Sequence, residues 1–204
     1  MLPSFVSPLG IHFFLLIRIE KDSTFNGFVK NLLNMDIIYI TFITSFGWIG
    51  LIKGEKGLKR VILPEKSRKE IVAKIKIFYP LSVPAEDKFK KEFKDITAYF
   101  SGNKKNISFP LDLSGSTSFQ RMVWSETAEI PYGQSRTYKF IAEKIGKNNS
   151  YRAVGNALGK NPFPLVIPCH RVVREDGTLG GFTASQGVAL KKKMLELEST
   201  WHSA

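Results

Sequence analysis

Residues 167–173, with the sequence IPCHRVV, place the chain's one cysteine between a proline and a histidine. A thiol is a nucleophile only as its thiolate, and little thiolate forms at neutral pH unless neighbouring groups favour it. Pro168 restricts the backbone before it, so we expect Cys169 on a rigid, non-helical turn. His170 supplies an imidazole and Arg171 a fixed positive charge, and both favour the thiolate. The segment therefore indicates a reactive cysteine, with a small buried side chain as the alternative.

Composition excludes several classes of site. One cysteine cannot form an internal disulfide, and with three histidines it does not match the usual Cys₄, Cys₃His or Cys₂His₂ ligand sets of structural zinc sites, so we expect no metal. The free thiol indicates a reducing compartment, and we expect a cytoplasmic protein. A formal net charge of +12 favours a polyanionic partner, nucleic acid before an acidic membrane surface. The apolar run at 11–17 is too short to span a membrane and lacks the pattern of a signal peptide.

The strands and helices that position this turn are expected to begin after residue 34. We expect residues 1–34 to be an N-terminal extension, because Met35 stands directly before the first well-patterned strand; an ordered arm is the alternative. Runs of β-branched and aromatic residues predict antiparallel strands at 37–48 and 58–63. Alternating apolar residues predict one more strand at 107–113.

Two helices are expected between these strands. Ser67 and Glu70 form a capping box for the first, which Pro80 stops. The second begins at Asp87 and ends near Gly102, with apolar residues spaced to form one face. Strands mixed with helices predict an α+β fold in which residues 35–115 form an N-terminal α/β domain with antiparallel strands.

Residues 116–204 have a different pattern, with short helices between glycine turns, and predict a C-terminal helical domain. Ser118 is expected to cap its first helix. Helices at 138–145 and 151–158, joined by the turn GKNN and with Ser150 as the second N-cap, are typical of a helix-turn-helix. Plain packing of two amphipathic helices is the alternative.

Five segments resemble, in order and spacing, the O6-alkylguanine-DNA alkyltransferase family. They are FQRMVW at 119–124, IPYG at 130–133, YRAVGNAL at 151–158, NPFPLVIPCHRVV at 161–173 and LGGF at 179–182. The resemblance covers roughly residues 36–198. It implies an N-terminal α/β domain and a C-terminal, winged-helix-like domain that carries the helix-turn-helix and a reactive cysteine, which fits the organisation above.

The resemblance implies a set of catalytic residues. Cys169 matches the nucleophile, His170 a base that acts through a water, and Glu196 the carboxylate that orients this base. Asn161 matches a residue that hydrogen-bonds near the active-site turn, and Tyr138 the tyrosine whose hydroxyl donates to N3 of the base. From the sequence alone, Glu196 fits equally a surface ion pair, Asn161 an Asn-Pro turn and Tyr138 the core.

The resemblance also implies double-stranded DNA as the partner, bound through the minor groove, with the damaged base flipped out of the stack. Arg152 matches the arginine that fills the vacated space. Tyr151, Ala153 and Asn156 lie at the same expected surface. A routine exposed arginine is the alternative for Arg152.

Three residues resemble the lining of an alkylguanine pocket: Val172, Phe182 and Thr183. Val172 and Phe182 fit equally a place in the core. After Phe182 the chain departs from many relatives, which have a glycine pair soon after this point, whereas here residues 183–186 precede Gly187. This departure affects the expected width of the pocket and the size of adduct that it accepts.

The implied function is DNA repair by irreversible transfer of the alkyl group from O6-alkylguanine, and from O4-alkylthymine, to Cys169. Each molecule reacts once, as a monomer and without a cofactor. The alternatives are a non-catalytic lesion-binding protein, whose known examples lack the cysteine, a cysteine hydrolase and a transcription factor. A transcription factor leaves the Pro-Cys-His run unexplained.

Overall fold

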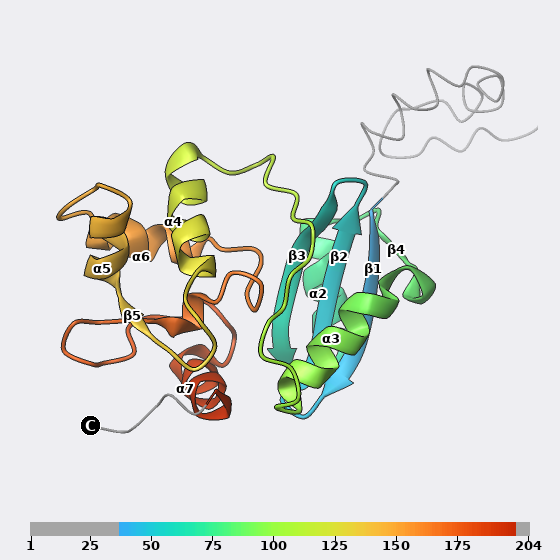
Figure 1. Cartoon of the computed structure of the whole chain (residues 1–204). Coiled ribbons are helices and arrows are strands. Elements are labelled where there is room, and N and C mark those ends of the chain that lie inside the picture. Colours follow the sequence, from blue (N-terminus) through green and yellow to red (C-terminus); the bar gives the residue numbers. More distant parts are fainter. Residues whose placement is uncertain (1–36, 199–204) are drawn as a thin grey trace, which may run out of the picture.

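The computed structural model of the protein describes residues 37–198, so the expected extension at 1–34 lies outside the described residues. A four-stranded sheet flanked by helices lies beside a second group of mainly helical elements (Figure 1). This is the α+β organisation that the sequence predicts. Across 37–198, no helix has the length and apolar character needed to cross a membrane.

The sheet is an antiparallel meander with a short parallel edge strand, in the order β3-β2-β1-β4. Its strands are β1 (Ile38–Thr44), β2 (Gly47–Gly54), β3 (Gly57–Glu65) and β4 (Val83–Pro84). The single strand expected at 37–48 is wrong in extent, because the chain turns after Thr44 and returns as β2. Gly47 makes this turn possible, since its φ is +124° and a Cβ there would lie 2.6 Å from the carbonyl oxygen of Glu65.

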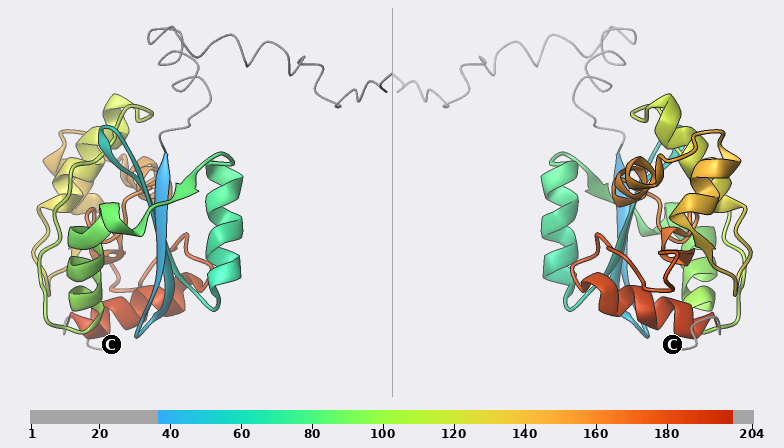
Figure 2. Two further views of the ribbon diagram at one scale, coloured as in Figure 1. Left: turned by 90° about the vertical axis from the view of Figure 1, so that its right-hand side faces the viewer. Right: turned by 90° about the vertical axis from the view of Figure 1, so that its left-hand side faces the viewer.

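Two helices cover the opposite faces of this sheet (Figure 2). Helix α2 (Arg68–Phe78) is confirmed where expected: the Ser67 hydroxyl accepts a hydrogen bond from the Glu70 amide at 3.3 Å. The helix expected from Asp87 begins as a 3₁₀ turn, η2 (Glu86–Phe89), and continues as α3 (Lys90–Phe100). Helix α3 lies on the side of the sheet that faces the C-terminal elements, so it can contribute to their site.

The strand expected at 107–113 is wrong. This segment makes only an isolated bridge to β3, where the Leu58 amide donates to the Pro110 carbonyl at 2.8 Å and the Asp112 amide donates to the Leu58 carbonyl at 2.7 Å. Pro110 has no amide hydrogen, so a regular ladder cannot continue through it. The segment instead runs alongside β3 and connects the sheet to the C-terminal helices (Figure 1).

Residues 118–198 contain four α-helices and a two-stranded parallel sheet. They are α4 (Ser118–Ala128), β5 (Arg136–Thr137), α5 (Tyr138–Lys144), α6 (Tyr151–Gly159), β6 (Val172–Val173) and α7 (Gly187–Leu197). The expected helix pair is confirmed in α5 and α6. Thr117 caps α4, not Ser118, and Ser150 takes the N-cap position of α6 without a side-chain hydrogen bond.

Helix α6 packs on α4 and α5 through one face only. Val154, Ala157 and Leu158 are buried, and the Trp124 indole donates to the Ala157 carbonyl at 2.9 Å. The opposite face of α6, which includes Arg152 and Asn156, is exposed. The packing therefore presents a polar helix face to solvent beside the cysteine turn.

Candidate active site

Cys169 lies on a short 3₁₀ turn, η3 (Cys169–Arg171), directly before β6. The Cys169 amide donates to the Ile167 carbonyl at 2.8 Å, and the Arg171 amide donates to the Pro168 carbonyl at 2.9 Å. The backbone is thus fixed and non-helical before the thiol, as the proline predicts. Because β6 pairs with β5, and β5 leads into α5, this turn lies close to the start of α5.

Asn161 holds the segment before the turn. Its side-chain amide donates to the Ile167 carbonyl at 2.8 Å, and its oxygen accepts from the Phe163 amide at 2.9 Å. A hydrogen bond from the same side chain favours the thiolate of Cys169. Asn161 therefore acts on both the backbone and the sulfur of this site.

Cys169 opens into a cleft of about 1900 Å³ between α6, the loop after β6 and the edge of the sheet. Seven of the residues predicted from the sequence line it: Tyr138, Tyr151, Arg152, Asn161, Cys169, Phe182 and Thr183. Ala153 and Asn156 are exposed on α6 outside this lining. The prediction for Val172 is wrong, because its side chain is fully buried in the core.

Two opposing effects act on the Cys169 thiol. Burial raises its pKa, while the hydrogen bond from Asn161 and the positive charge of Lys191 oppose that shift. The sequence reasoning missed Lys191 and assigned the charge to Arg171, whose guanidinium instead binds Glu198. A net raised pKa means that the thiol needs a base to reach its reactive form at neutral pH.

Lys191 is fully buried on α7. Its ammonium group donates to the Val172 carbonyl at 2.5 Å and to the Leu179 carbonyl. Burial lowers the pKa of Lys191 to about 8, against the attraction of the Cys169 thiolate. A cation at this place both fixes the loop after β6 and favours a negative sulfur.

Tyr138 is the first residue of α5, lines the cleft and packs against Gly180 in the loop after β6. A Cβ on residue 180 would lie 2.9 Å from the Tyr138 hydroxyl, so the glycine at this position lets the Tyr138 ring pack closely against the loop. Burial raises the pKa of Tyr138, and the negative charge of a Cys169 thiolate raises it further. The hydroxyl therefore stays protonated and can donate a hydrogen bond into the cleft.

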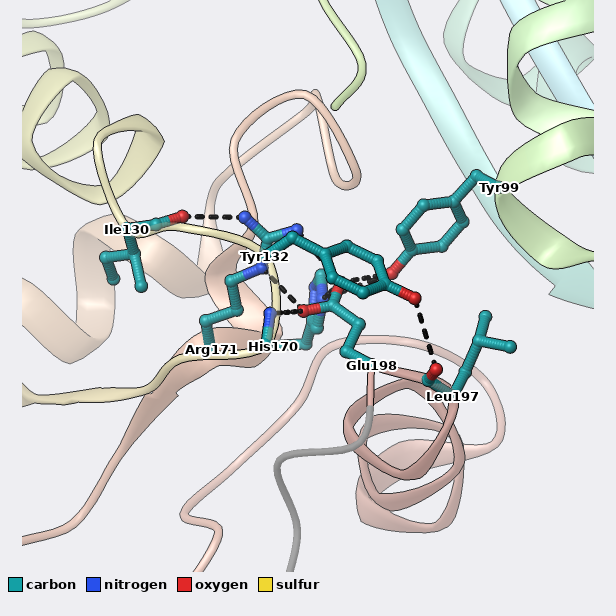
Figure 3. Close-up of polar contacts among 8 residues, drawn as sticks. Tyr99, Ile130, Tyr132, His170, Arg171, Leu197 and Glu198 are labelled. Carbon is teal, nitrogen blue, oxygen red and sulfur yellow. Dashed lines mark hydrogen bonds and ion pairs between the residues drawn. The ribbon is translucent and has the colours of Figure 1, made fainter. Parts of the chain in front are cut away.

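The Glu198 carboxylate joins three side chains in a buried network (Figure 3). Its Oε1 lies 3.0 Å from His170 Nε2 and accepts from the Tyr99 hydroxyl at 2.6 Å. Arg171 donates to both carboxylate oxygens, at 2.8 and 2.9 Å. Tyr99 comes from α3, so the N-terminal half of the chain completes this network.

This network sets the protonation of His170. Burial lowers the pKa of His170 more than Glu198 raises it, so the imidazole is neutral at pH 7. A carboxylate only accepts, so the proton belongs on Nε2 and the lone pair on Nδ1. Nδ1 is buried and has no hydrogen-bond partner among residues 37–198. The histidine next to the thiol therefore offers a free basic nitrogen.

The prediction that Glu196 orients His170 is wrong. Glu196 is exposed, and its carboxylate lies 3.8 Å from the ammonium of Lys192, one helical turn away. In the structure it is Glu198 that contacts His170, and the Glu198 side chain has no solvent exposure. Although burial raises the pKa of Glu198, hydrogen bonds from His170 and Arg171 lower it to about 2, so it is a carboxylate at neutral pH.

The arrangement supplies a nucleophile, a neutral base backed by a carboxylate, and a phenol that can donate a proton. Within the part of the chain that the structure describes, no group of three His, Cys, Asp or Glu side chains could hold a metal ion. The chemistry that these residues support is attack by sulfur on a group bound in the cleft.

We expect Lys191→Met to slow the reaction of Cys169 with iodoacetamide roughly tenfold at neutral pH, because the cation that favours the thiolate is lost. The measurement is the alkylation rate across a pH series, followed by mass spectrometry. Lys192→Met is the matched control, since this neighbouring lysine is exposed and its one ion-pair partner within the described range 37–198 is Glu196. Equal rates in the two variants would contradict the role of Lys191.

Comparison with protein families gives two matches that together span most of the chain. A family model described as 6-O-methylguanine DNA methyltransferase, ribonuclease-like domain, matches residues 37–113. A second, described as 6-O-methylguanine DNA methyltransferase, DNA binding domain, matches residues 118–200.

Individual relatives agree with these matches. The methylated-DNA–protein-cysteine methyltransferase of Methanosarcina barkeri is 41% identical over 163 residues, which cover 79% of this chain and 97% of that protein. The solved structure of Mycobacterium tuberculosis O6-methylguanine methyltransferase matches with a TM-score of 0.68 and 32% identity, over 82% of this chain and 96% of that one. A structure of Mycobacterium tuberculosis OGT in complex with DNA matches with a TM-score of 0.66 and 33% identity, over 80% and 93% of the two chains.

Proposed function

Because the chain belongs to the O6-methylguanine DNA methyltransferase family, we propose how its cleft carries out the reaction of that family. The protein is a methylated-DNA–protein-cysteine methyltransferase that binds DNA and repairs O6-methylguanine, and Cys169 is its one cysteine. The observation that carries the mechanism is that Cys169 lines an open cleft and is followed directly in the chain by a buried, neutral histidine whose Nδ1 has no hydrogen-bond partner among residues 37–198.

The first step is ionisation of the thiol. His170 Nδ1 takes the proton of Cys169 through a bridging water, and Glu198 stabilises the imidazolium that forms. Tyr99 and Arg171 hold the carboxylate in place from the other side. Lys191 and Asn161 then stabilise the thiolate.

The second step is displacement at carbon. The sulfur forms a bond to the alkyl carbon as the bond from that carbon to O6 breaks, and the electron pair passes to the guanine. Tyr138 donates a hydrogen bond to N3 of the leaving base, which stabilises the charge that develops on the ring. The proton lost by the thiol ends on the guanine, and the product is a thioether on Cys169. Nothing in this sequence of steps restores the thiol, so each molecule acts once.

DNA binding is assigned to the exposed face of α6. Tyr151 and Arg152 lie at the mouth of the cleft, and Ala153 and Asn156 continue the same surface. We propose that this helix enters the minor groove and that Arg152 occupies the space of the flipped base. The same pocket would accept O4-alkylthymine. One chain contains every group used, so a monomer suffices, and we place it in the cytoplasm.

The test is intact-protein mass spectrometry after the protein is mixed with a duplex that contains one O6-methylguanine. We expect a gain of one methylene mass per protein, confined by peptide mapping to the peptide that bears Cys169. A duplex with unmodified guanine is the control. Binding of the lesion duplex without any mass gain would contradict the transfer reaction.

We expect Arg152→Ala to slow transfer from duplex DNA roughly tenfold to a hundredfold, because an extruded base is no longer replaced in the stack. Reaction with the free base O6-benzylguanine should be unchanged, since it needs no flipping. The matched control is Arg121→Ala, which removes an exposed arginine from α4, outside the cleft. An equal loss with the free base would show that Arg152 supports the pocket and not base flipping.

A further inference from the structure

Residues 182–186 form a loop in the wall of the cleft, with Gly180 and Gly181 before it and Gly187 after it. Gly180 has φ +68° and Gly187 has φ +55°, in the region that glycine adopts without strain. Phe182 and Thr183 face the cleft, and the Thr183 hydroxyl lies 3.5 Å from the position of a Cβ on Gly159 of α6. The loop therefore reaches the C-terminal end of α6 and lies between two glycines in the left-handed conformation.

The C-terminal end of this loop is bound to the N-terminal sheet and to α2. The Ser185 hydroxyl donates to Oε1 of Glu65, the last residue of β3, and the ammonium group of Lys74 on α2 donates to both Ser185 and Glu65. The Gln186 side chain donates to the Pro64 carbonyl at 2.9 Å. Four side chains, from β3, α2 and the loop, thus tie the loop to the other half of the protein.

Glu65 ends β3 with a side chain that is only 8% exposed, which is unusual for a carboxylate. A buried carboxylate needs partners that compensate for lost hydration, and here Lys74 and Ser185 supply them. Since Ser185 provides one of these contacts from the loop, release of the loop would leave Glu65 less well satisfied. These contacts therefore stabilise the loop in the position that the structure shows.

We propose that Glu65, Lys74 and Ser185 form an interdomain latch that holds the loop 182–186 closed and so limits the size of the alkyl group that reaches Cys169. The proposal rests on the function proposed above. Glu65, Lys74 and Ser185 line the same cleft as Phe182 and Thr183, so a movement of the loop away from β3 would widen the pocket at the wall that Phe182 and Thr183 form. The N-terminal domain, which supplies Glu65 and Lys74, thereby acts on substrate selection.

The experiment is a competition for Cys169 between two duplexes, one with O6-methylguanine and one with O6-benzylguanine, at equal concentrations. Mass spectrometry gives the ratio of benzylated to methylated protein, and this ratio does not depend on the fraction of protein that is folded. We expect Glu65→Gln and Ser185→Ala each to raise the ratio roughly three- to tenfold, as for the loss of one hydrogen bond. The double variant should show no more than the larger single effect, because both changes open the same latch.

Glu92→Gln is the matched control. Glu92 is also a buried carboxylate paired with a lysine, Lys53, at 2.6 Å, but this pair joins β2 to α3 and does not touch the loop. Its variant should keep the wild-type ratio. An unchanged ratio in Glu65→Gln and Ser185→Ala, or an equal rise in Glu92→Gln, overturns the latch alone. Wild-type protein that gains no alkyl group from either duplex overturns the proposed function and the latch with it.

Discussion

Replacing Cys169 by serine is expected to slow alkyl transfer by at least about ten-thousandfold while binding to the lesion duplex stays within about twofold. Serine nearly matches cysteine in size, so the turn, the cleft and α6 keep their positions. Its hydroxyl is a far weaker acid than a thiol, and a neutral imidazole does not ionise it enough to attack an sp³ carbon.

Binding and chemistry can be separated in this variant because they are assigned to different elements of the structure. The groups proposed to hold DNA lie on α6, and those that hold Cys169 lie on η3 and the segment from Asn161. The serine hydroxyl can still accept the hydrogen bond that Asn161 gives to the thiol. Binding is measured by fluorescence anisotropy with a labelled O6-methylguanine duplex, and transfer by mass spectrometry on the same sample.

Two results would contradict this expectation. A methyl group that appears on any other residue of the Cys169→Ser protein would show that Cys169 is not the acceptor. Loss of duplex binding would show that the thiol turn shapes the DNA surface, so that failed transfer would carry no information about the nucleophile. Cys169→Ala is the second variant, because it removes the hydroxyl and so excludes slow attack by serine.

Local patterns in the sequence predicted the part of the site that depends on neighbouring residues. Cys169 and His170 are adjacent, and the two helices that carry Tyr138 and Arg152 are separated by the clear turn GKNN. The two strand errors have local causes as well. Gly47 permits a tight turn inside an otherwise continuous β pattern, and Pro110 interrupts an alternating segment, so composition alone did not show where pairing stops.

Other parts of the site depend on contacts that no local pattern reveals. Tyr99 meets Glu198 across 99 positions in the sequence, and Ser185 meets Glu65 across 120. Such pairs form only when the two domains pack together. The choice between Glu196 and Glu198 was different, because helical periodicity held a signal: Glu198 follows Met194 by four residues, and Met194 is fully buried on α7.

The choice between these two glutamates leads to the second large effect. We expect Glu198→Gln to lower the transfer rate roughly a hundredfold and to reduce the free energy of unfolding by about 3 kcal/mol. The amide keeps the shape of the carboxylate but not its charge. It therefore leaves the Arg171 guanidinium buried without a counterion, and it no longer supports a positive charge on His170 after proton transfer.

The stability effect has a defined pH dependence. The pKa of Glu198 is lowered from 4.5 to about 2 in the folded protein. A carboxyl group with a depressed folded pKa stabilises the protein above its unfolded pKa, and this contribution is lost as the pH falls through the folded value. The difference in the free energy of unfolding between wild type and Glu198→Gln should therefore have its full size above pH 4.5 and become smaller toward pH 2. Urea unfolding at a series of pH values measures it.

Glu196→Gln tests which glutamate supports His170: Glu198, as in the structure, or Glu196, as the sequence suggested. This variant changes the same side chain two residues earlier, at an exposed position whose only charged partner in residues 37–198 is Lys192. It should unfold at the same urea concentration as wild type and transfer methyl groups at the same rate. Transfer rates are compared at neutral pH after titration of the folded fraction, so that lost stability is not counted as lost catalysis. If Glu196→Gln slows transfer and Glu198→Gln does not, the buried carboxylate is structural only, and the base at His170 depends on a partner that reaches it from the helix surface.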